Sequence, residues 1–343
     1  MRKHSRVLVA MEIWQPGLEQ LRQLVGAENI VIVPPFEDFI SLPIGQIGDC
    51  TVVFGEFPPT NMAEMAGLEW VQLGSAGYEQ LKGFPLIERG VRVSNASGVN
   101  DVPIAEWCVA MMILFERDLR GLLANQQAHM WDRSPRFQSE LRGRRVGIIG
   151  YGNIGREVGR LCRCLGLEVW AMDQRTIGPR PNRYAPAGTG DPEAAAPQRT
   201  FVISQMTEFL PHLDFLILTM PLTASTRGII GEKELRLMKP SAYLLNPARG
   251  PLLVEDALLR ALAEGWIAGA ALDTHFRYPL PPEHPLWDMP NVVLTPHISG
   301  SSAGREFLPR VWDLFGQNLA RFMADEPLLN ELSTVELANV GVR

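Results

Sequence analysis

The sequence lacks the features that mark several other classes of protein. It has few cysteines, at spacings that suit neither a disulfide framework nor a metal clamp: Cys50, Cys108, Cys162 and Cys164. We therefore expect reduced cysteines, no metal site and a cytoplasmic location. No apolar run is long enough to cross a membrane. The first such run, Val7–Met11, is too short for the core of a signal peptide and fits a strand better.

Concentrated positive charge is also missing. The net charge is -6 at pH 7, and lysines and arginines are scattered among the acidic residues. A nucleic-acid surface would need a basic patch, so we expect neither a nucleic-acid nor a membrane partner. Hydrophobic residues make up 46% and charged residues 20%, an ordinary globular balance. A chain of 343 residues can form two domains of usual size.

Short β-branched runs alternate with helical stretches along the chain. Before residue 100 the expected strands are Val7–Met11, Ile30–Val33, Thr51–Gly55, Trp70–Leu73 and Val91–Ser94. A second series follows one long apolar helix, Ile104–Leu123, and comprises Val146–Gly150, Val169–Asp173, Phe215–Met220, Tyr243–Asn246, Ala268–Leu272 and Val292–Thr295. The last helix is expected at Ala303–Met323. This alternation predicts two α/β domains, each with a parallel sheet covered on both faces.

One segment, Ile177–Arg199, carries five prolines together with glycines and alanines. Proline breaks helices, and small residues bury little surface. We expect a long surface loop that forms a mobile insertion; the alternative is a lid over a cofactor.

A glycine pattern, G-x-G-x-x-G, runs from Gly150 to Gly155 between a predicted strand and a predicted helix. Gly150 permits a tight turn, Gly152 lets a pyrophosphate approach the backbone, and Gly155 lets the helix pack close to the strand. Asp173 ends the next strand, 18 residues after Gly155, where its carboxylate can accept both ribose hydroxyl protons. That charge would repel a 2′-phosphate, so NAD is favoured over NADP. Arg175 points the other way, because it could pair with the 2′-phosphate of NADP.

Further motifs lie downstream and upstream in a fixed order. They are Gly74–Gly77, Ile104–Glu106, Asp214–Thr223, Thr226, Met238–Pro240, Leu245–Gly250, Gly269–Asp273, Pro285–Trp287 and Thr295–His297. Their order and spacing resemble the D-isomer-specific 2-hydroxyacid dehydrogenase family over nearly the whole chain. The resemblance implies two Rossmann-like domains with a cleft between them. A cofactor domain, residues 104–298, would be inserted into a flavodoxin-like substrate domain formed by residues 1–103 and 299–343.

Two residues at the ends of predicted parallel strands are candidates for catalysis. Arg249 offers a fork of donors that can bind a substrate carboxylate or polarise a carbonyl. His297 can give a proton to a ketone oxygen as hydride arrives from the nicotinamide. By resemblance, the substrate carboxylate would be held by the backbone N–H groups of Ser75, Ala76 and Gly77. Asn100 could also reach the cleft, or it could cap the helix that follows it.

The resemblance also implies a set of cofactor contacts and a homodimer formed through the cofactor domain, with the helix Ile104–Leu123 as a suitable surface. The expected partners are therefore a small carboxylate substrate, NAD and a second copy of the chain. The cofactor-binding residues would be Gly150, Gly152, Asn153, Ile154, Gly155, Asp173, Gln174, Arg175, Met220, Pro221, Thr226, Pro247, Ala248, Arg249, Asp273, His297 and Gly300.

The sequence departs from the family at one catalytic position. Family members carry a glutamate just before a proline after the strand that ends at Asp273, where it hydrogen-bonds the histidine and raises its pKa. Here that position is Tyr278, so His297 should have a lower pKa. Tyr278 could orient His297, or His275 or Glu283 could stand in for the glutamate. Two alternatives remain: hydride transfer without a proton relay, as in formate dehydrogenases, or NAD binding without turnover by a sensor or interaction protein.

Overall fold

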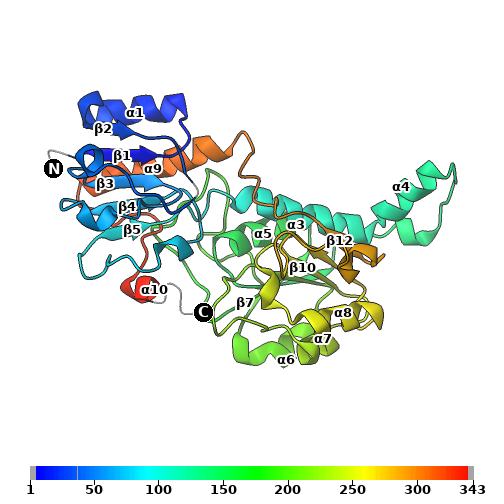
Figure 1. Ribbon diagram of the computed structural model, residues 1–343. Coiled ribbons are helices and arrows are strands. Elements are labelled where there is room, and N and C mark those ends of the chain that lie inside the picture. Colours follow the sequence, from blue (N-terminus) through cyan, green and yellow to red (C-terminus); the bar gives the residue numbers. More distant parts are fainter. Residues whose placement is uncertain (1–4, 37, 339–343) are drawn as a thin grey trace. The chain divides into compact units, whose positions relative to one another are not determined.

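The computed structural model describes residues 5–36 and 38–338. The chain divides into two compact units, each with its own parallel sheet (Figure 1). The first unit comprises Met1–Val99, Pro181–Pro186 and Ser302–Arg343, and the second comprises Asn100–Arg180 and Ala187–Ser301. The chain thus passes between the units a few residues from the expected boundaries and also makes an excursion at 181–186 that the sequence did not suggest.

The first unit has a five-stranded sheet in the order β2-β1-β3-β4-β5. All neighbouring strands are parallel, and the order is that of the flavodoxin-like folds, as expected. Three central strands, β1, β3 and β4, are buried along their whole length because helices and loops cover both faces. The strands are β1 (Val7–Ala10), β2 (Ile30–Ile32), β3 (Val52–Gly55), β4 (Trp70–Leu73) and β5 (Arg92–Ser94).

Aromatic side chains join helix α9 (Phe307–Met323) to the first sheet. The ring of Phe315 stacks on Phe54 with centroids 4.1 Å apart, and it also stacks on Trp70. The apolar face of α9 therefore forms part of this core, although the helix begins at Phe307 rather than at the expected Ala303. The other helices of this unit are α1 (Gln15–Val25), which packs against α9, α2 (Ile44–Ile47) and α10 (Thr334–Ala338).

The second unit has a seven-stranded parallel sheet in the order β12-β11-β10-β9-β6-β7-β8. Read from β8, this is the Rossmann order 3-2-1-4-5-6 with one strand added at the edge. The sequence missed β8 because it follows the proline-rich segment and buries only Phe201. The strands are β6 (Arg145–Ile149), β7 (Glu168–Asp173), β8 (Arg199–Val202), β9 (Phe215–Leu218), β10 (Tyr243–Asn246), β11 (Gly269–Leu272) and β12 (Val292–Leu294).

The apolar helix expected at Ile104–Leu123 is in fact two helices, α3 (Asp101–Glu116) and α4 (Leu119–Gln127). Asp118 breaks it, because its backbone is left-handed (φ 41°) and its side chain accepts the Gly121 N–H as a helix cap. Helix α4 projects away from the rest of its unit (Figure 1). The remaining helices are α5 (Asn153–Cys164), α6 (Met206–Phe209), α7 (Glu232–Leu237) and α8 (Glu255–Ala263).

The proline-rich segment contains no helix or strand before β8, as expected, but one of its side chains is buried in each of the two units. Tyr184 is buried in the core of the first unit, and its hydroxyl donates to Asp313 over 2.9 Å. Asp191 is buried in the second unit and accepts from the hydroxyl of Tyr151 over 2.7 Å. The expectation of a mobile insertion is therefore corrected. The proline content indicated a loop but could not reveal the buried anchors at Tyr184 and Asp191.

Candidate functional site

The glycine turn between β6 and α5 needs its glycines. Gly150 has a φ of +93°, and a Cβ atom there would lie 2.6 Å from the backbone nitrogen of Met220. A Cβ atom on Gly155 would lie 3.0 Å from the Thr219 hydroxyl, so α5 can pack this closely only with glycine. The first N–H groups of a helix have no partner within the helix. The turn therefore fits the phosphates of a dinucleotide.

Asp173 is fixed beside this turn. One carboxylate oxygen accepts the N–H of Tyr151 over 2.8 Å, and the other accepts the N–H of Arg175 over 3.1 Å. The side chains of Gln174 and Arg175 are exposed. Because two backbone donors hold the carboxylate, its charge lies at a defined place at the end of β7.

The loop after β9 is shaped by Thr226. Its buried hydroxyl donates to the carbonyl of Pro221 over 2.8 Å and accepts the N–H of Thr223 over 2.7 Å. Met220, just before this loop, lies against Gly150 of the glycine turn. Thr226 therefore has a bracing task within its loop, and its contact with a cofactor remains a prediction.

Asn246, at the end of β10, holds the loop that carries Arg249. Its fully buried amide donates to the carbonyl of Arg249 over 2.8 Å and accepts the N–H of Ala248 over 3.1 Å. One guanidinium nitrogen of Arg249 donates back to Ala248 over 2.7 Å. Sequence reasoning missed Asn246. The available signal was an asparagine that ends an apolar strand and precedes Pro247.

Asp273, at the end of β11, organises the loop of His297. One carboxylate oxygen accepts the Thr295 hydroxyl over 2.6 Å and the Ile298 N–H over 2.9 Å, and the other accepts the N–H and hydroxyl of Ser299. The carboxylate is fully buried. The family resemblance implies that Asp273 touches the cofactor. The structure gives it a positioning task, and the cofactor contact remains a prediction.

His297 lies beside both Arg249 and Tyr278. Its ring centroid is 5.5 Å from that of Tyr278, and its backbone is left-handed (φ 57°). Burial lowers the pKa of His297, and the positive charge of Arg249 lowers it further, against the opposing effect of Asp273. His297 as a whole residue is nevertheless exposed. The lowered pKa of His297 agrees with the prediction made from the missing glutamate. Burial and the charge of Arg249 are causes of this shift that the sequence did not reveal.

Neither proposed stand-in supplies a negative charge to His297. His275 is buried, its Nε2 lies 2.8 Å from the carbonyl of Thr295, and its backbone N–H donates to the Tyr278 hydroxyl over 3.2 Å. Its Nδ1 is buried with no partner in residues 5–36 and 38–338, so the ring is only half satisfied. Glu283 is exposed and, in that same part of the chain, forms no hydrogen bond or ion pair with His297.

Residues 75–77 follow β4 in the first unit. The Ser75 hydroxyl donates to the carbonyl of Gly77 over 3.0 Å, and the amide of Asn95 donates to the carbonyl of Ala76 over 2.7 Å. The backbone N–H groups of Ser75, Ala76 and Gly77 have no acceptor among the described residues. Three such donors in one turn fit an anionic oxygen.

Asn100 is the first residue of the second unit. It is the N-cap residue of α3, as the second alternative expects, but its side chain makes no capping hydrogen bond. A Cβ atom on Gly300 would lie 3.6 Å from its amide nitrogen. Asn100 therefore lies beside the loop that follows His297.

In the described ranges, no group of three or more histidine, cysteine or acidic side chains is placed so that it could hold a metal ion. The four cysteines are unpaired thiols. None of the helices described combines the length and apolarity that crossing a bilayer requires.

Solved structures share this fold. A protein from Thermus thermophilus superposes with a TM-score of 0.70 at 27% identity, covering 96% of this chain and 100% of that one. An NADPH-dependent glyoxylate/hydroxypyruvate reductase from Sinorhizobium meliloti, solved with NADP and sulfate, gives a TM-score of 0.73 at 24% identity, covering 97% and 99%. The second likeness concerns the fold alone.

Sequence comparisons carry the assignment further. The chain is 33% identical over 328 residues to a glyoxylate reductase of Thermofilum pendens, covering 94% of this chain and 92% of the relative. It is 28% identical over 323 residues to a hydroxypyruvate reductase of Blautia hydrogenotrophica, covering 91% and 92%. Residues 109–299 match the NAD-binding domain of the D-isomer-specific 2-hydroxyacid dehydrogenases. The chain therefore belongs to the D-isomer-specific 2-hydroxyacid dehydrogenase family, and its second unit is the domain that binds a nicotinamide dinucleotide.

Proposed function

We propose that this protein reduces a small 2-oxo acid to the 2-hydroxy acid with NADH, and catalyses the reverse reaction. The observation that carries the proposal is the placement of Arg249 and His297 on the loops after β10 and β12 of one parallel sheet, close enough for the charge of Arg249 to lower the pKa of His297. Two relatives are named glyoxylate reductase and hydroxypyruvate reductase, which favours a small substrate.

The residues divide the work as follows. Arg249 has guanidinium donors beyond the one bonded to Ala248, and these bind the substrate carboxylate or polarise its ketone. The hydride that the carbonyl carbon accepts would come from a bound nicotinamide. As the C=O double bond opens, the His297 imidazolium gives its proton to the oxygen and becomes neutral. The N–H groups of residues 75–77 hold the carboxylate.

The cofactor we propose is NAD(H) rather than NADP(H). The carboxylate of Asp173 is held by the N–H groups of Tyr151 and Arg175, so it cannot easily turn away from a ribose. Each oxygen keeps a lone pair that can accept a ribose hydroxyl, whereas a 2′-phosphate would meet a fixed negative charge.

A substrate panel tests the proposal. Purified protein is mixed with NADH or NADPH and with glyoxylate, hydroxypyruvate and larger 2-oxo acids, and the loss of nicotinamide absorbance is followed. We expect turnover of a small 2-oxo acid with NADH preferred. Tight NADH binding without turnover of any 2-oxo acid would contradict the proposal. Oxidation of formate with NAD in the same assay would instead support hydride transfer without a proton relay.

Replacing Tyr278 by glutamate is expected to raise the rate of ketone reduction at neutral pH by about tenfold. A carboxylate beside the imidazolium favours its charged form and would raise the His297 pKa by roughly one unit. In the parent, burial and Arg249 lower that pKa, so the protonated fraction is lost at a lower pH. The measurement is kcat against pH, whose descending limb should move to higher pH.

Tyr278→Gln is the matched control, because glutamine has the length of glutamate without its charge. The glutamine variant should keep the parental pH profile. If the glutamate and glutamine variants have the same profile, Tyr278 does not occupy the position that tunes His297. Tyr278 is 57% exposed, so both variants should fold.

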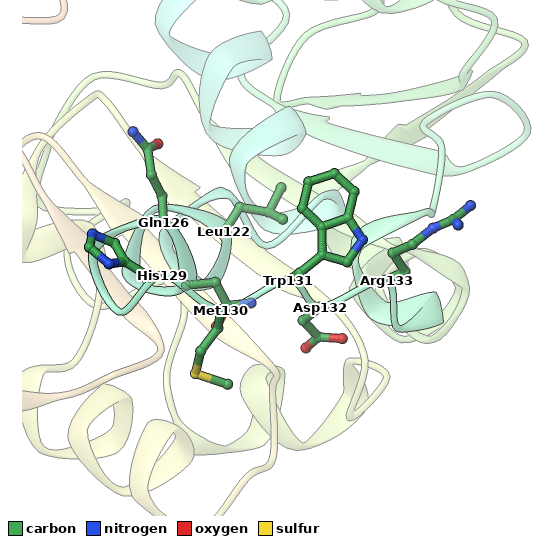
Figure 2. Close-up of a pocket in the computed structure, with 8 residues that line it drawn as sticks. Leu122, Gln126, His129, Met130, Trp131, Asp132 and Arg133 are labelled. Atoms are coloured by element: carbon green, nitrogen blue, oxygen red, sulfur yellow. The ribbon is translucent and has the colours of Figure 1, made fainter.

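We also propose that the protein is a homodimer formed through the region of α3 and α4. A shallow groove of about 490 Å³ lies on α4 and the chain that follows it. Figure 2 shows the side chains of Met130 and Trp131 extending from this stretch. Trp131 is 91% exposed, which is unusual for so large an apolar ring and typical of an interface.

Trp131→Ala should weaken the dimer by roughly tenfold or more in dissociation constant, as loss of a central aromatic anchor does. Sedimentation equilibrium over a range of protein concentrations measures this. Trp287→Ala is the control, because Trp287 is also exposed, at 53%, and belongs to the same unit but does not line the groove. A parent protein that is monomeric at all concentrations, or equal effects of both variants, would contradict this interface.

A further inference from the structure

Arg180 lies in front of the glycine turn, although it comes from the proline-rich segment. A Cβ atom built on Gly152 would have one guanidinium nitrogen of Arg180 as its nearest neighbour, 3.7 Å away. Gly152 directly precedes α5, at the place where phosphate approaches the backbone in dinucleotide-binding turns. A positive side chain therefore stands beside the space that a cofactor phosphate would enter.

The backbone around Arg180 is held in place rather than loosely draped. Its N–H donates to the carbonyl of Pro192 over 3.1 Å. Two positions earlier, the carbonyl of Gly178 accepts from the guanidinium of Arg156 over 2.6 Å. Arg156 is a buried residue of α5, so the phosphate-binding helix itself carries this part of the segment.

A second tie involves the turn directly. Tyr151, between the first two glycines, donates its hydroxyl to Asp191 over 2.7 Å, and Asp191 also accepts the N–H groups of Ala195 and Ala196. The segment is thus fastened on both sides of Arg180 to the turn and to α5. Its course is coupled to the geometry of the cofactor site.

The guanidinium of Arg180 forms no ion pair with a carboxylate of the described residues. Within residues 5–36 and 38–338 its guanidinium has no ion-pair or hydrogen-bond partner. Arg156 lies near enough to Arg180 for the two positive charges to repel each other. The guanidinium of Arg156 donates to the carbonyls of Gly178, Asp191 and Pro192. Asp191 and Asp173 are the acidic groups nearby, and both are held by other donors. Beside the turn, Arg180 therefore keeps a guanidinium with no direct partner in the described part of the chain.

We propose that Arg180 binds a phosphate group of the nicotinamide dinucleotide, so that the proline-rich segment forms part of the cofactor site. This deepens the proposed function and rests on dinucleotide binding. A guanidinium pairs with two phosphate oxygens at once and keeps its charge at any physiological pH. The pyrophosphate is common to NADH and NADPH, whereas the 2′-phosphate belongs to NADPH alone, and both are anions that this side chain can bind.

The test compares Arg180→Gln with Arg163→Gln by titration with NADH, NADPH, ADP-ribose and adenosine. Arg163 is an exposed cation near the other end of the same helix, roughly 15 Å along its axis. We expect Arg180→Gln to raise the Kd for NADH, NADPH and ADP-ribose by about tenfold and to leave adenosine binding unchanged. Arg163→Gln should leave all four unchanged.

Each other pattern of results has a definite meaning. A weakening confined to NADPH supports the proposal and assigns the contact to the 2′-phosphate. An equal weakening of adenosine overturns it, because adenosine carries no phosphate and the substitution would then have distorted the site. Unchanged binding of NADH and NADPH also overturns it. A parent protein that binds neither dinucleotide would instead contradict the proposed function.

Discussion

Replacing His297 by asparagine is expected to lower kcat for 2-oxo acid reduction by about 10²–10⁴-fold, the usual effect of losing a positioned acid. Asparagine can keep a hydrogen bond and tolerates the left-handed backbone (φ 57°) that His297 adopts. It has no proton to give at neutral pH. Stopped-flow measurement of a single turnover isolates the chemical step from product release.

NADH titration is the control for this variant, and its Kd should stay within about twofold of the parent, because asparagine can keep a hydrogen bond at position 297 and the glycine turn and Asp173 lie elsewhere in the sheet. The pH dependence should also flatten, since the titrating group is gone. A variant that keeps the parental rate would remove His297 from the mechanism. A flat, slow reaction in the parent itself would favour hydride transfer without a proton relay.

Replacing Asp273 by asparagine is expected to lower the free energy of unfolding by roughly 2–4 kcal/mol. In the parent, each carboxylate oxygen accepts two donors. Whichever way the new amide turns, its NH₂ group faces two donors and leaves them unsatisfied in a buried place. Urea unfolding, with the slope held in common, measures the loss.

Asp288→Asn is the matched control, because Asp288 is exposed and belongs to the same unit. It should change the free energy of unfolding by less than about 0.5 kcal/mol. Asp273→Asn should also lower kcat, since the donors from Ile298 and Ser299 fix the loop that follows His297. Unchanged stability would mean that water or a neighbouring side chain replaces the lost bonds.

The strands and the glycine turn could be predicted from sequence because their signals are local. Buried parallel strands read as continuous β-branched runs, and Gly150 and Gly155 are needed for contacts within one strand–turn–helix unit. The break at Asp118 was missed because apolar residues continue at helical spacing across it. Only the left-handed backbone and the cap on Gly121 show that the helix stops.

The supporting residues of the site were harder to predict because side-chain hydrogen bonds to loops leave no periodic signal. Asn246 donates to the carbonyl of Arg249 and accepts the N–H of Ala248 in the loop after its own strand, whereas Asp273 accepts donors from the loop after β12. His275 was expected as a possible stand-in for the glutamate, and it is buried with one nitrogen bonded to a backbone carbonyl. Arg180 belongs to no recognisable motif. Its place beside the glycine turn depends on the hydrogen bond between Tyr151 and Asp191, which the sequence does not reveal.

The excursion at 181–186 also limits how this chain can be recombined with its relatives. A chimera that exchanges residues 100–301 as one cassette would replace Tyr184 but keep Asp313 and Asn330 of the host, and so separate the two sides of that anchor. An expressed fragment of the same range would present the tyrosine ring to water. Grafting or fragment work should therefore replace Tyr184 by a small polar residue and keep Gly178, Arg180 and Asp191, so that no orphaned tyrosine remains.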